Sequence, residues 1–394
     1  MVSFFQNVRN VIRIGAGIAA VAALAACEPM PNSGRVGPSA PSGPTSPVDI
    51  ALLVPAGSGV DELEAIAASL ESAARLAAAD ITGVQVNLTV YNTQRNTPTA
   101  VAAAQQAIAS GADVILGPLD GEAAAAVGLA VASSGRSVLT FSNNTAVAGG
   151  GVYLLGQTFQ DSARRLSSFA VSQGKTRPVV LNARTVAGEA GRSAVVNALT
   201  LNGTPPLAVV SYENTLPGIS SAVGDVRRVV GEMGADSIVL TSSTSGALPI
   251  LAELLPEAGV DPVTTQYLGL ARWDLDSRLF SLTGAEGGWF TMPDRARGAA
   301  FEARFNAAYG TRPHPLAFTA YDGVAVIAAL WAQGGSNPLS AEAITRPQGF
   351  QGSTGIVRFS RDGTNERGLA IGTIQAQQVL TISAAPQSFA VAAF

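Results

Sequence analysis

Two short apolar runs each end in polar residues that could hold a small ligand. Val114–Leu116 ends in Gly-Pro and is followed by Asp120 and Gly121. Val138–Phe141 is followed by a polar tetrad that consists of Ser142, Asn143, Asn144 and Thr145. Hydroxyl, amide and backbone N–H groups can orient a polar solute by hydrogen bonds. These two loops are therefore the first candidate binding residues.

Other candidate contacts follow later apolar runs. Arg272 and Trp273 come after Thr265–Leu270. The arginine could bind a carboxylate by two parallel hydrogen bonds, and the tryptophan could stack on a ligand. Arg184 and Ser243 end two further runs. The alternative is structural: Arg272 would be solvated, Trp273 would pack within its own lobe, and Asp120 would cap the helix after it. The residues alone leave both interpretations open.

The elements around the first two loops form a predicted βαβ unit. Val114–Leu116 and Val138–Phe141 have the composition of buried strands, and the alanine-rich segment Gly121–Ser133 between them is typical of a helix. Parallel strands of such a unit end at the same edge of the sheet, where open α/β sheets bind ligands. We therefore expect the two loops to lie side by side.

The rest of the chain predicts two α/β lobes. Strands are expected at Asp49–Val54 and Val84–Tyr91, and a second helix–strand series covers Asp161–Leu270. The C-terminal tail has the pattern of antiparallel strands. Its apolar runs Ile356–Phe359 and Leu369–Ile374 lie on either side of Asp362-Gly363, and a third run, Gln378–Ile382, follows them. We expect the first lobe to comprise about residues 48–148 and 292–335. The second lobe would comprise about 152–290 and 336–394.

The N-terminal segment is typical of an exported bacterial lipoprotein. Arg9 and Arg13 precede the apolar stretch Ile14–Ala23, and Leu24–Cys27 looks like a lipobox with Cys27 as the lipidated residue. Residues 1–26 would be the signal peptide and 27–47 a proline-rich tether. A plain secretory signal with an incidental cysteine is the alternative. Glu28 is not the aspartate linked to inner-membrane retention, which favours the outer membrane.

Composition argues against several classes of function. The 394 residues carry a net charge of −4 and include one lysine, so nucleic acid is not an expected partner. His314 is the only histidine and Cys27 the only cysteine, which argues against a catalytic triad, a thiol catalyst or a histidine-rich metal site. Two carboxylates meeting in space for glycoside hydrolysis stay open. We expect a non-enzymatic protein without cofactor or metal.

From Pro47 onward the chain resembles the type I periplasmic binding proteins of the leucine/isoleucine/valine-binding class. The resemblance is carried by Leu116–Gly121, Ser142–Thr145, Ala320–Gly323 and the Phe359–Gly363 turn. It implies a bilobed α/β fold, two three-layer αβα lobes with parallel-rich sheets joined by hinge crossings. Within this class, the chain resembles the penicillin-binding protein activator lipoproteins. This finer resemblance is carried by the lipobox and by the segments TQYLGLARWD and GGWFTMPD.

The resemblance also implies where an amino acid would bind. Its carboxylate would meet Asp120-Gly121 and Asn143–Thr145, where only Thr145 keeps the family's hydroxyl. The aromatic and the acid that hold the ammonium group would fall near Thr185–Val186 and Ala271-Arg272, and neither is present. A buried ammonium without such partners is costly. The site is therefore not expected to take a free α-amino acid.

Two functions follow from the resemblance. The preferred one is a lipid-anchored, periplasm-facing accessory regulator of peptidoglycan synthesis, whose partner would be a penicillin-binding protein. The alternative is the substrate-binding lipoprotein of an ABC importer, which would bind a small polar ligand, such as an amino-acid derivative or an amide, and an ABC permease. In both, the lipid on Cys27 would attach the protein to the membrane.

Overall fold

The computed structural model describes residues 46–389, which belong to one compact unit. The predicted signal peptide, Cys27 and nearly all of the tether lie outside the described residues. Within 46–389 no helix is both long enough and apolar enough to cross a bilayer.

The first lobe is built on a parallel sheet with the strand order β2-β1-β3-β4-β5. Apart from the edge strand β2, in which half-buried and exposed residues largely alternate, its strands read as almost continuous apolar runs because helices cover both faces of the sheet. The strands are β1 (Val48–Val54), β2 (Val86–Asn92), β3 (Val114–Leu116), β4 (Val138–Thr140) and β5 (Val152–Leu154). The covering helices are α1 (Asp61–Asp80), α2 (Thr97–Ala109), α3 (Gly121–Val131), α8 (Arg295–Tyr309) and α9 (Ala317–Trp331).

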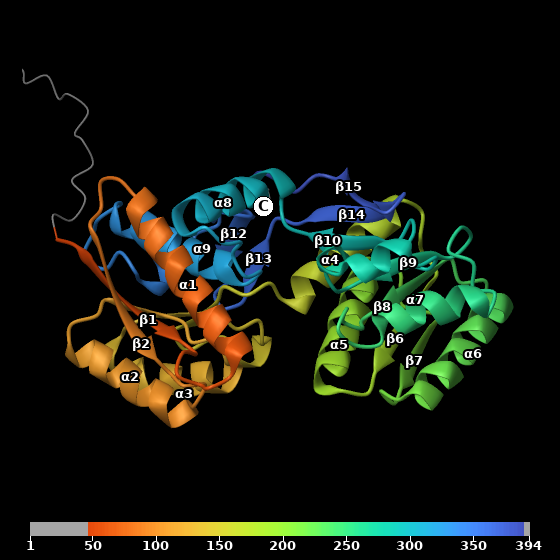
Figure 1. Ribbon diagram of the computed structural model, residues 1–394, viewed down its shortest axis with the longest axis horizontal. Helices are drawn as coiled ribbons and strands as arrows, with labels where there is room; N and C mark the ends of the chain where they lie inside the picture. Colours follow the sequence, from red (N-terminus) through yellow and green to blue (C-terminus); the bar gives the residue numbers. More distant parts are fainter. Residues whose placement is uncertain (1–45, 390–394) are drawn as a thin grey trace, which may run out of the picture. The chain divides into compact units, whose positions relative to one another are not determined.

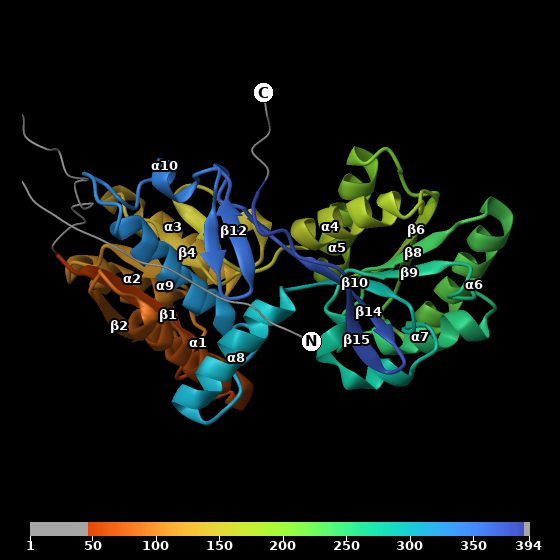
Figure 2. The ribbon, with the colours of Figure 1, turned by 90° about the horizontal axis from the view of Figure 1, so that it is seen from above.

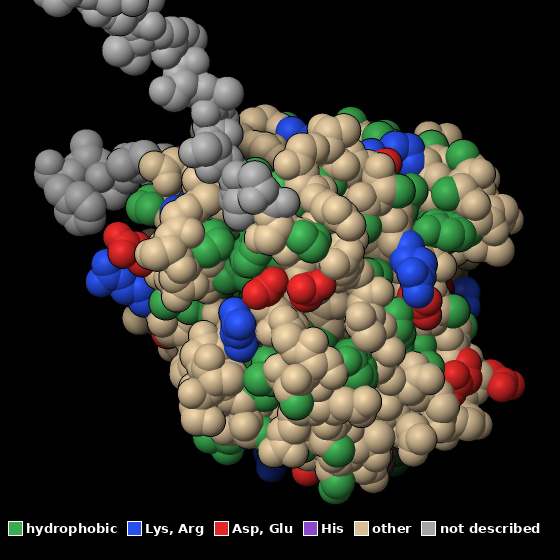
Figure 3. Space-filling model, turned by 90° about the vertical axis from the view of Figure 1, so that its left-hand side faces the viewer, with side chains coloured by type: hydrophobic (Ala, Val, Ile, Leu, Met, Phe, Trp, Pro, Cys, Tyr) green, Lys and Arg blue, Asp and Glu red, His purple; other side chains and the backbone are tan. Residues whose placement is uncertain are grey.

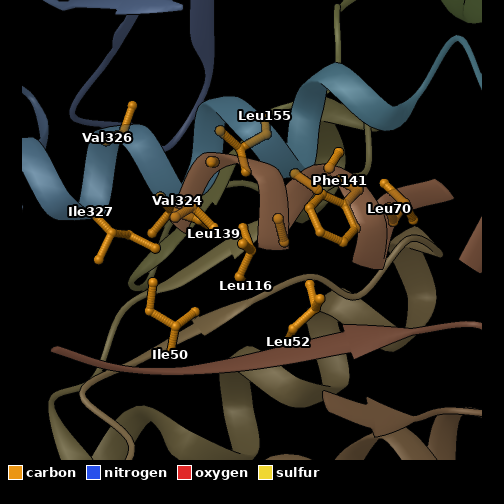
Figure 4. Close-up of a cluster of buried hydrophobic side chains, with 14 of the residues drawn as sticks. Ile50, Leu52, Leu70, Leu116, Leu139, Phe141, Leu155, Val324, Val326 and Ile327 are labelled. Carbon is orange, nitrogen blue, oxygen red and sulfur yellow. The ribbon is translucent and has the colours of Figure 1, made fainter. Parts of the chain in front are cut away.

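The core of this lobe lies between the sheet and helices α1 and α9. Figure 4 shows Ile50, Leu52, Leu116 and Leu139 from the strands facing Leu70 and Val324 from the helices. All six side chains are fully buried. On the other face of the sheet, alanines of α2 and α3 let these helices approach the strands closely. The lobe therefore has a complete three-layer core.

The second lobe is built on a mixed sheet with the order β15-β14-β10-β9-β8-β6-β7. Strands β6 to β10 are parallel, and β14 and β15 are added antiparallel at one edge, beside β10 in Figures 1 and 2. The strands are β6 (Pro178–Ala183), β7 (Ala208–Tyr212), β8 (Ser237–Leu240), β9 (Gln266–Gly269), β10 (Trp289–Met292), β14 (Ala370–Gln375) and β15 (Gln378–Ser383). One face is covered by α4 (Phe159–Ser172) and α5 (Val186–Leu201), the other by α6 (Leu216–Met233) and α7 (Leu248–Glu257).

The expected fold class is confirmed, but the lobe boundaries differ from the prediction. Val152–Leu154 was expected in the second lobe and is the fifth strand of the first sheet, because it pairs with β4. The segment after residue 336 also returns to the first lobe. It forms α10 (Ala341–Ile344) and the small sheet of β11 (Phe350–Gly352), β12 (Gly355–Phe359) and β13 (Asn365–Arg367).

The tail hairpin also has a different partner from the one expected. Asp362-Gly363 joins β12 to β13, and the run expected to complete the hairpin, Leu369–Ile374, instead forms β14 in the other lobe. The Asp362 carboxylate accepts hydrogen bonds from the backbone N–H and the hydroxyl of Thr364, 2.9 and 2.6 Å away. This local turn reverses the chain after β12 and so leaves the next strand free to cross.

Within the described residues, three chain segments join the lobes: after β5, after β10 and between β13 and β14. A buried cluster holds two of them together, and we call Asp322, Ser353, Asn365 and Arg367 the hinge cluster. Arg367 donates to the Leu155 carbonyl and to the Asp322 carboxylate, 2.6 and 2.9 Å away. Asn365 donates to the carbonyls of Leu154 and Gly156. The first and third crossings therefore share one polar anchor.

Charged side chains are scattered over the face of the molecule in Figure 3. Lys and Arg do not gather into a patch there, as they would on a surface that binds nucleic acid.

Candidate functional site

A cavity of about 410 Å³ lies between the two lobes, and we call it the interlobe cavity. Its apolar lining includes Leu119, Phe141 and Phe318 from the first lobe and Phe159, Leu270 and Leu275 from the second. Its polar lining consists of Ser142, Asn143, Gln157, Thr158, Ser162 and Arg272. Both lobes and the first crossing contribute to it, so a solute here would touch both halves of the protein.

The two loops of the first lobe meet at one wall of this cavity. They lie side by side because β3 and β4 are parallel neighbours that end at the same edge. A Cβ atom on Gly121 would sit 3.2 Å from both the Ser142 hydroxyl and the Asn144 amide nitrogen, so a larger residue would crowd this contact. The buried Ser142 hydroxyl accepts the backbone N–H of Asn144 at 3.1 Å, which fixes the loop.

Among residues 46–389, Arg272 supplies the only charged side chain on the cavity wall. Asp274 holds it: Nε of Arg272 donates to Oδ1 and Nη2 donates to Oδ2, at 2.7 and 2.5 Å. The two side chains are 26% and 16% exposed. A guanidinium has five N–H donors, so this fork leaves three of them for another acceptor. Arg272 is therefore held in one orientation and still has N–H donors that can bind a ligand.

Trp273 does not line the cavity, and the expectation that it offers a stacking face to a ligand is wrong. Its side chain is fully buried and stacks on Phe290 with ring centroids 5.9 Å apart. The indole lies between Gly269 and Gly288, where an added Cβ would come within about 2.2 Å of the ring. Within residues 272–274, the Trp273 side chain therefore packs in the core of the second lobe, whereas the side chains of Arg272 and Asp274 are partly exposed.

Replacing Trp273 with phenylalanine tests this core role. We expect the free energy of unfolding to fall by about 1–3 kcal/mol, because the smaller ring leaves a partial cavity while the unpartnered buried indole N–H is removed. Ligand affinity should not change. Urea denaturation and calorimetric titration measure the two effects, and a variant that keeps its stability but loses ligand would contradict the assignment.

The remaining predicted site residues are not part of the cavity wall. Asp120 does not cap α3 through its side chain; it pairs with Arg95 at 3.3 Å. Asn144 caps the short helix that begins at Thr145, whose hydroxyl accepts from Gln160 of the second lobe at 3.3 Å. Arg184 lies 3.8 Å from Glu213, and the Ser243 hydroxyl lies 3.4 Å from that of Ser245. Of the predicted residues, those that line the cavity are Ser142, Asn143 and Arg272.

The sequence did not predict the cavity residues Gln157 and Thr158, which lie on the first crossing, or the phenylalanine Phe318. Gln157 and Thr158 follow β5, and the short apolar run Val152–Leu154 could have signalled a third loop at the same sheet edge. Phe318 lies at the start of α9, and no local pattern marks it as a cavity residue. The Gln157 amide donates to the Ser162 hydroxyl at 2.9 Å, and Thr158 caps α4 by accepting the backbone N–H of Asp161.

Within residues 46–389, no group of three or more His, Cys, Asp or Glu side chains is placed to hold a metal ion. His314 accepts the backbone N–H of Leu316 through Nδ1 at 3.2 Å, and burial lowers its pKa. It therefore stabilises a turn next to α9.

Residues 47–378 match the family described as periplasmic binding protein. The chain belongs to that family. As a periplasmic binding protein, it shares the fold of many solved structures at low sequence identity. A branched-chain amino acid ABC transporter periplasmic ligand-binding protein from Burkholderia xenovorans is 16% identical, with a TM-score of 0.70 over 86% of this chain and 96% of the other.

Two further structures extend this likeness. An amino acid ABC transporter substrate-binding protein from Pseudomonas fluorescens is 18% identical, with a TM-score of 0.65 over 88% of this chain and 97% of that one. A solute-binding protein of an ABC transporter from R. palustris, in complex with benzoate, is 15% identical, with a TM-score of 0.60 over 88% and 99% of the two chains. No curated protein sequence matches the chain. At these identities the likeness shows the fold.

Proposed function

We propose that this periplasmic binding protein captures a small solute between its lobes and presents it to an ABC permease. The observation that carries the proposal is the interlobe cavity, which both lobes and the first crossing line. Hinged lobes of this kind close around a ligand, and the ligand then stabilises the closed form. The polar groups on the wall point to recognition, and the proposed role is non-catalytic.

The comparisons support this role more than the regulator role preferred from the sequence. The structures from Burkholderia xenovorans and Pseudomonas fluorescens are described as ABC transporter ligand- or substrate-binding proteins. Family membership supports a periplasmic location. The motif ending in Cys27 supports a lipid anchor there, and Glu28 supports the outer membrane.

A ligand is expected to raise the melting temperature of the protein. At one hundred times its dissociation constant, a ligand adds about 2.7 kcal/mol, which corresponds to about 4 °C for a chain of this size. A thermal-shift screen of carboxylic acids, amino acids, amides and cell-wall fragments measures the effect.

Two tryptophan variants control the screen. Ala271→Trp fills the cavity and should remove the shift, whereas Leu201→Trp on the exposed end of α5 should retain it. If no solute in the screen shifts the melting temperature, or if Ala271→Trp keeps the full shift, the proposed capture of a solute in this cavity is wrong.

The regulator role is a second proposal, favoured by the lipobox-like motif and the proline-rich tether. Crosslinking the full-length protein in cells and then isolating it from membranes should recover a penicillin-binding protein if this role is correct. Recovery of permease subunits instead would support the import role.

A further inference from the structure

We propose that the interlobe cavity selects a small monocarboxylic acid with an apolar body and no amino group, and that Arg272 binds its carboxylate. This inference rests on the proposed solute-binding function and names the class of solute. It depends on three properties of the wall that the described residues form: its single charged side chain, its aromatic and aliphatic surface, and the lack of a carboxylate that could pair with an ammonium group.

The charge on the wall favours an anion. In the part of the chain that the structure describes, Arg272 is the only charged side chain that lines the cavity. The Asp274 carboxylate accepts two hydrogen bonds from one edge of the guanidinium, and this orients the remaining N–H donors for a second acceptor. Arginine binds carboxylates by such paired hydrogen bonds, and a donor that is already oriented loses little entropy when it binds. A ligand carboxylate would therefore complete the coordination of Arg272.

The rest of the wall favours an apolar body. Phe141 and Leu119 from one lobe face the same cavity as Phe159 and Leu270 from the other, and Phe318 lies on the side of the hinge. The Phe318 ring also lies 4.9 Å from the guanidinium carbon of Arg367, so the hinge cluster holds it in place. The volume of about 410 Å³ lies near the lower end of ligand cavities, which suits a small acid.

An amino group would find no carboxylate partner among the described residues that line the cavity. Among the described residues, none of the side chains that line it is an aspartate or a glutamate. A neighbouring cavity of about 280 Å³ contains Asp274, Asp294 and Glu302. Asp274 is engaged by Arg272, Asp294 accepts the backbone N–H groups of the first turn of α8, and Glu302 is exposed. An ammonium group buried beside Arg272 would lose hydration and gain only neutral acceptors, with no counter-charge and with the repulsion of the guanidinium.

Matched pairs of ligands test the proposal by calorimetric titration. 3-Phenylpropionate is compared with L-phenylalanine, and 4-methylpentanoate with L-leucine, because each pair differs only in the amino group. We expect at least one acid to bind and to bind at least tenfold more tightly than its amino acid. 2-Phenylethylamine, which has the ring and the amino group but no carboxylate, should not bind.

Variants at Arg272 identify the group that binds the carboxylate. Arg272→Gln should weaken binding of the acid at least tenfold, and Arg272→Lys, which keeps the charge but loses the fork, should fall between it and the wild type. Arg278→Gln is the matched control. Arg278 forms the same kind of fork with Asp276, is 71% exposed and does not line the cavity. Melting curves confirm that each variant is folded.

The outcomes separate this inference from the proposed function. Tighter binding of the amino acid or of the amine would overturn the ligand class while leaving solute capture intact. Unchanged binding of the acid to folded Arg272→Gln would overturn the role of Arg272. If neither acid binds, the ligand class is wrong, and the thermal-shift screen then decides whether the cavity takes any solute.

Discussion

Replacing Arg367 with methionine is expected to lower the free energy of unfolding by about 3–5 kcal/mol. Arg367 and Asp322 are 4% and 0% exposed, and removing the arginine leaves the carboxylate buried without its counter-charge. The carboxylate would keep the backbone N–H and the hydroxyl of Ser353, at 2.6 and 2.8 Å. The Leu155 carbonyl would lose its donor at the first crossing. Urea denaturation followed by circular dichroism measures the loss.

Two further variants separate the buried charge from general damage. The double variant Arg367→Met with Asp322→Asn should lose less than the sum of the two single changes, because the pair is removed together. Arg228→Met removes an exposed arginine that pairs with Asp225 and Glu232, and its cost should stay below about 1 kcal/mol. A loss at Arg367 no larger than the loss at Arg228 would show that the hinge cluster does not depend on this pair.

The second large effect that we expect is a change in the free energy of unfolding with pH, and Asp161 is its source. This carboxyl is buried in the first turn of α4, its Oδ2 has no hydrogen-bond partner, and burial raises its pKa to about 7. Arg164 and Arg367 lower its pKa, as does the hydrogen bond with Thr158, and Glu366 raises it. Below about pH 4 both folded and unfolded forms hold the proton. Between about pH 4 and pH 7 only the folded form holds it, so stability falls as the pH rises.

Asp161→Asn should remove this pH dependence. Each unit of pKa shift corresponds to about 1.4 kcal/mol, so the wild type should lose up to about 4 kcal/mol between pH 4 and pH 7 relative to the variant. Melting temperatures measured from pH 4 to pH 8 should therefore lie closest together at pH 4 and diverge in favour of Asp161→Asn as the pH rises to 8. Asp225→Asn, at an exposed position on α6, should follow the wild type. Parallel curves for the wild type and Asp161→Asn would show that Asp161 is ionised throughout this range.

Much of the fold could be predicted because its strands are apolar runs bounded by glycine, proline or polar residues. Asp49–Val54 and Val114–Leu116 read as buried strands for this reason, and they form β1 and β3. Local sequence does not show which sheet a short strand joins. Val152–Leu154 has three residues after a run of glycines, and only its pairing with β4 places it in the first lobe.

The site could be predicted in part for the same reason. Loops that follow neighbouring parallel strands must share an edge, which brings Gly121 next to Ser142. The sequence could not show which of three consecutive residues, Arg272, Trp273 or Asp274, turns inward, because they belong to a short 3-10 turn in which each step along the chain rotates the side chain by about 120°. Phe318 lies far beyond the first loops in the sequence, and only the tertiary structure brings them together at the cavity.

The strand and helix order has a consequence for how the chain folds as it is synthesised. The first sheet is complete at Leu154, but helices α8 and α9, which cover it, begin at Arg295. The second sheet lacks its edge until β14 and β15, which end at Ser383. Neither half is a continuous piece of chain, so a ribosome that has released only the first half of the protein has released no finished domain. Each lobe therefore stays incomplete until later sequence has been synthesised, and a truncated product should expose apolar surface that chaperones and proteases recognise.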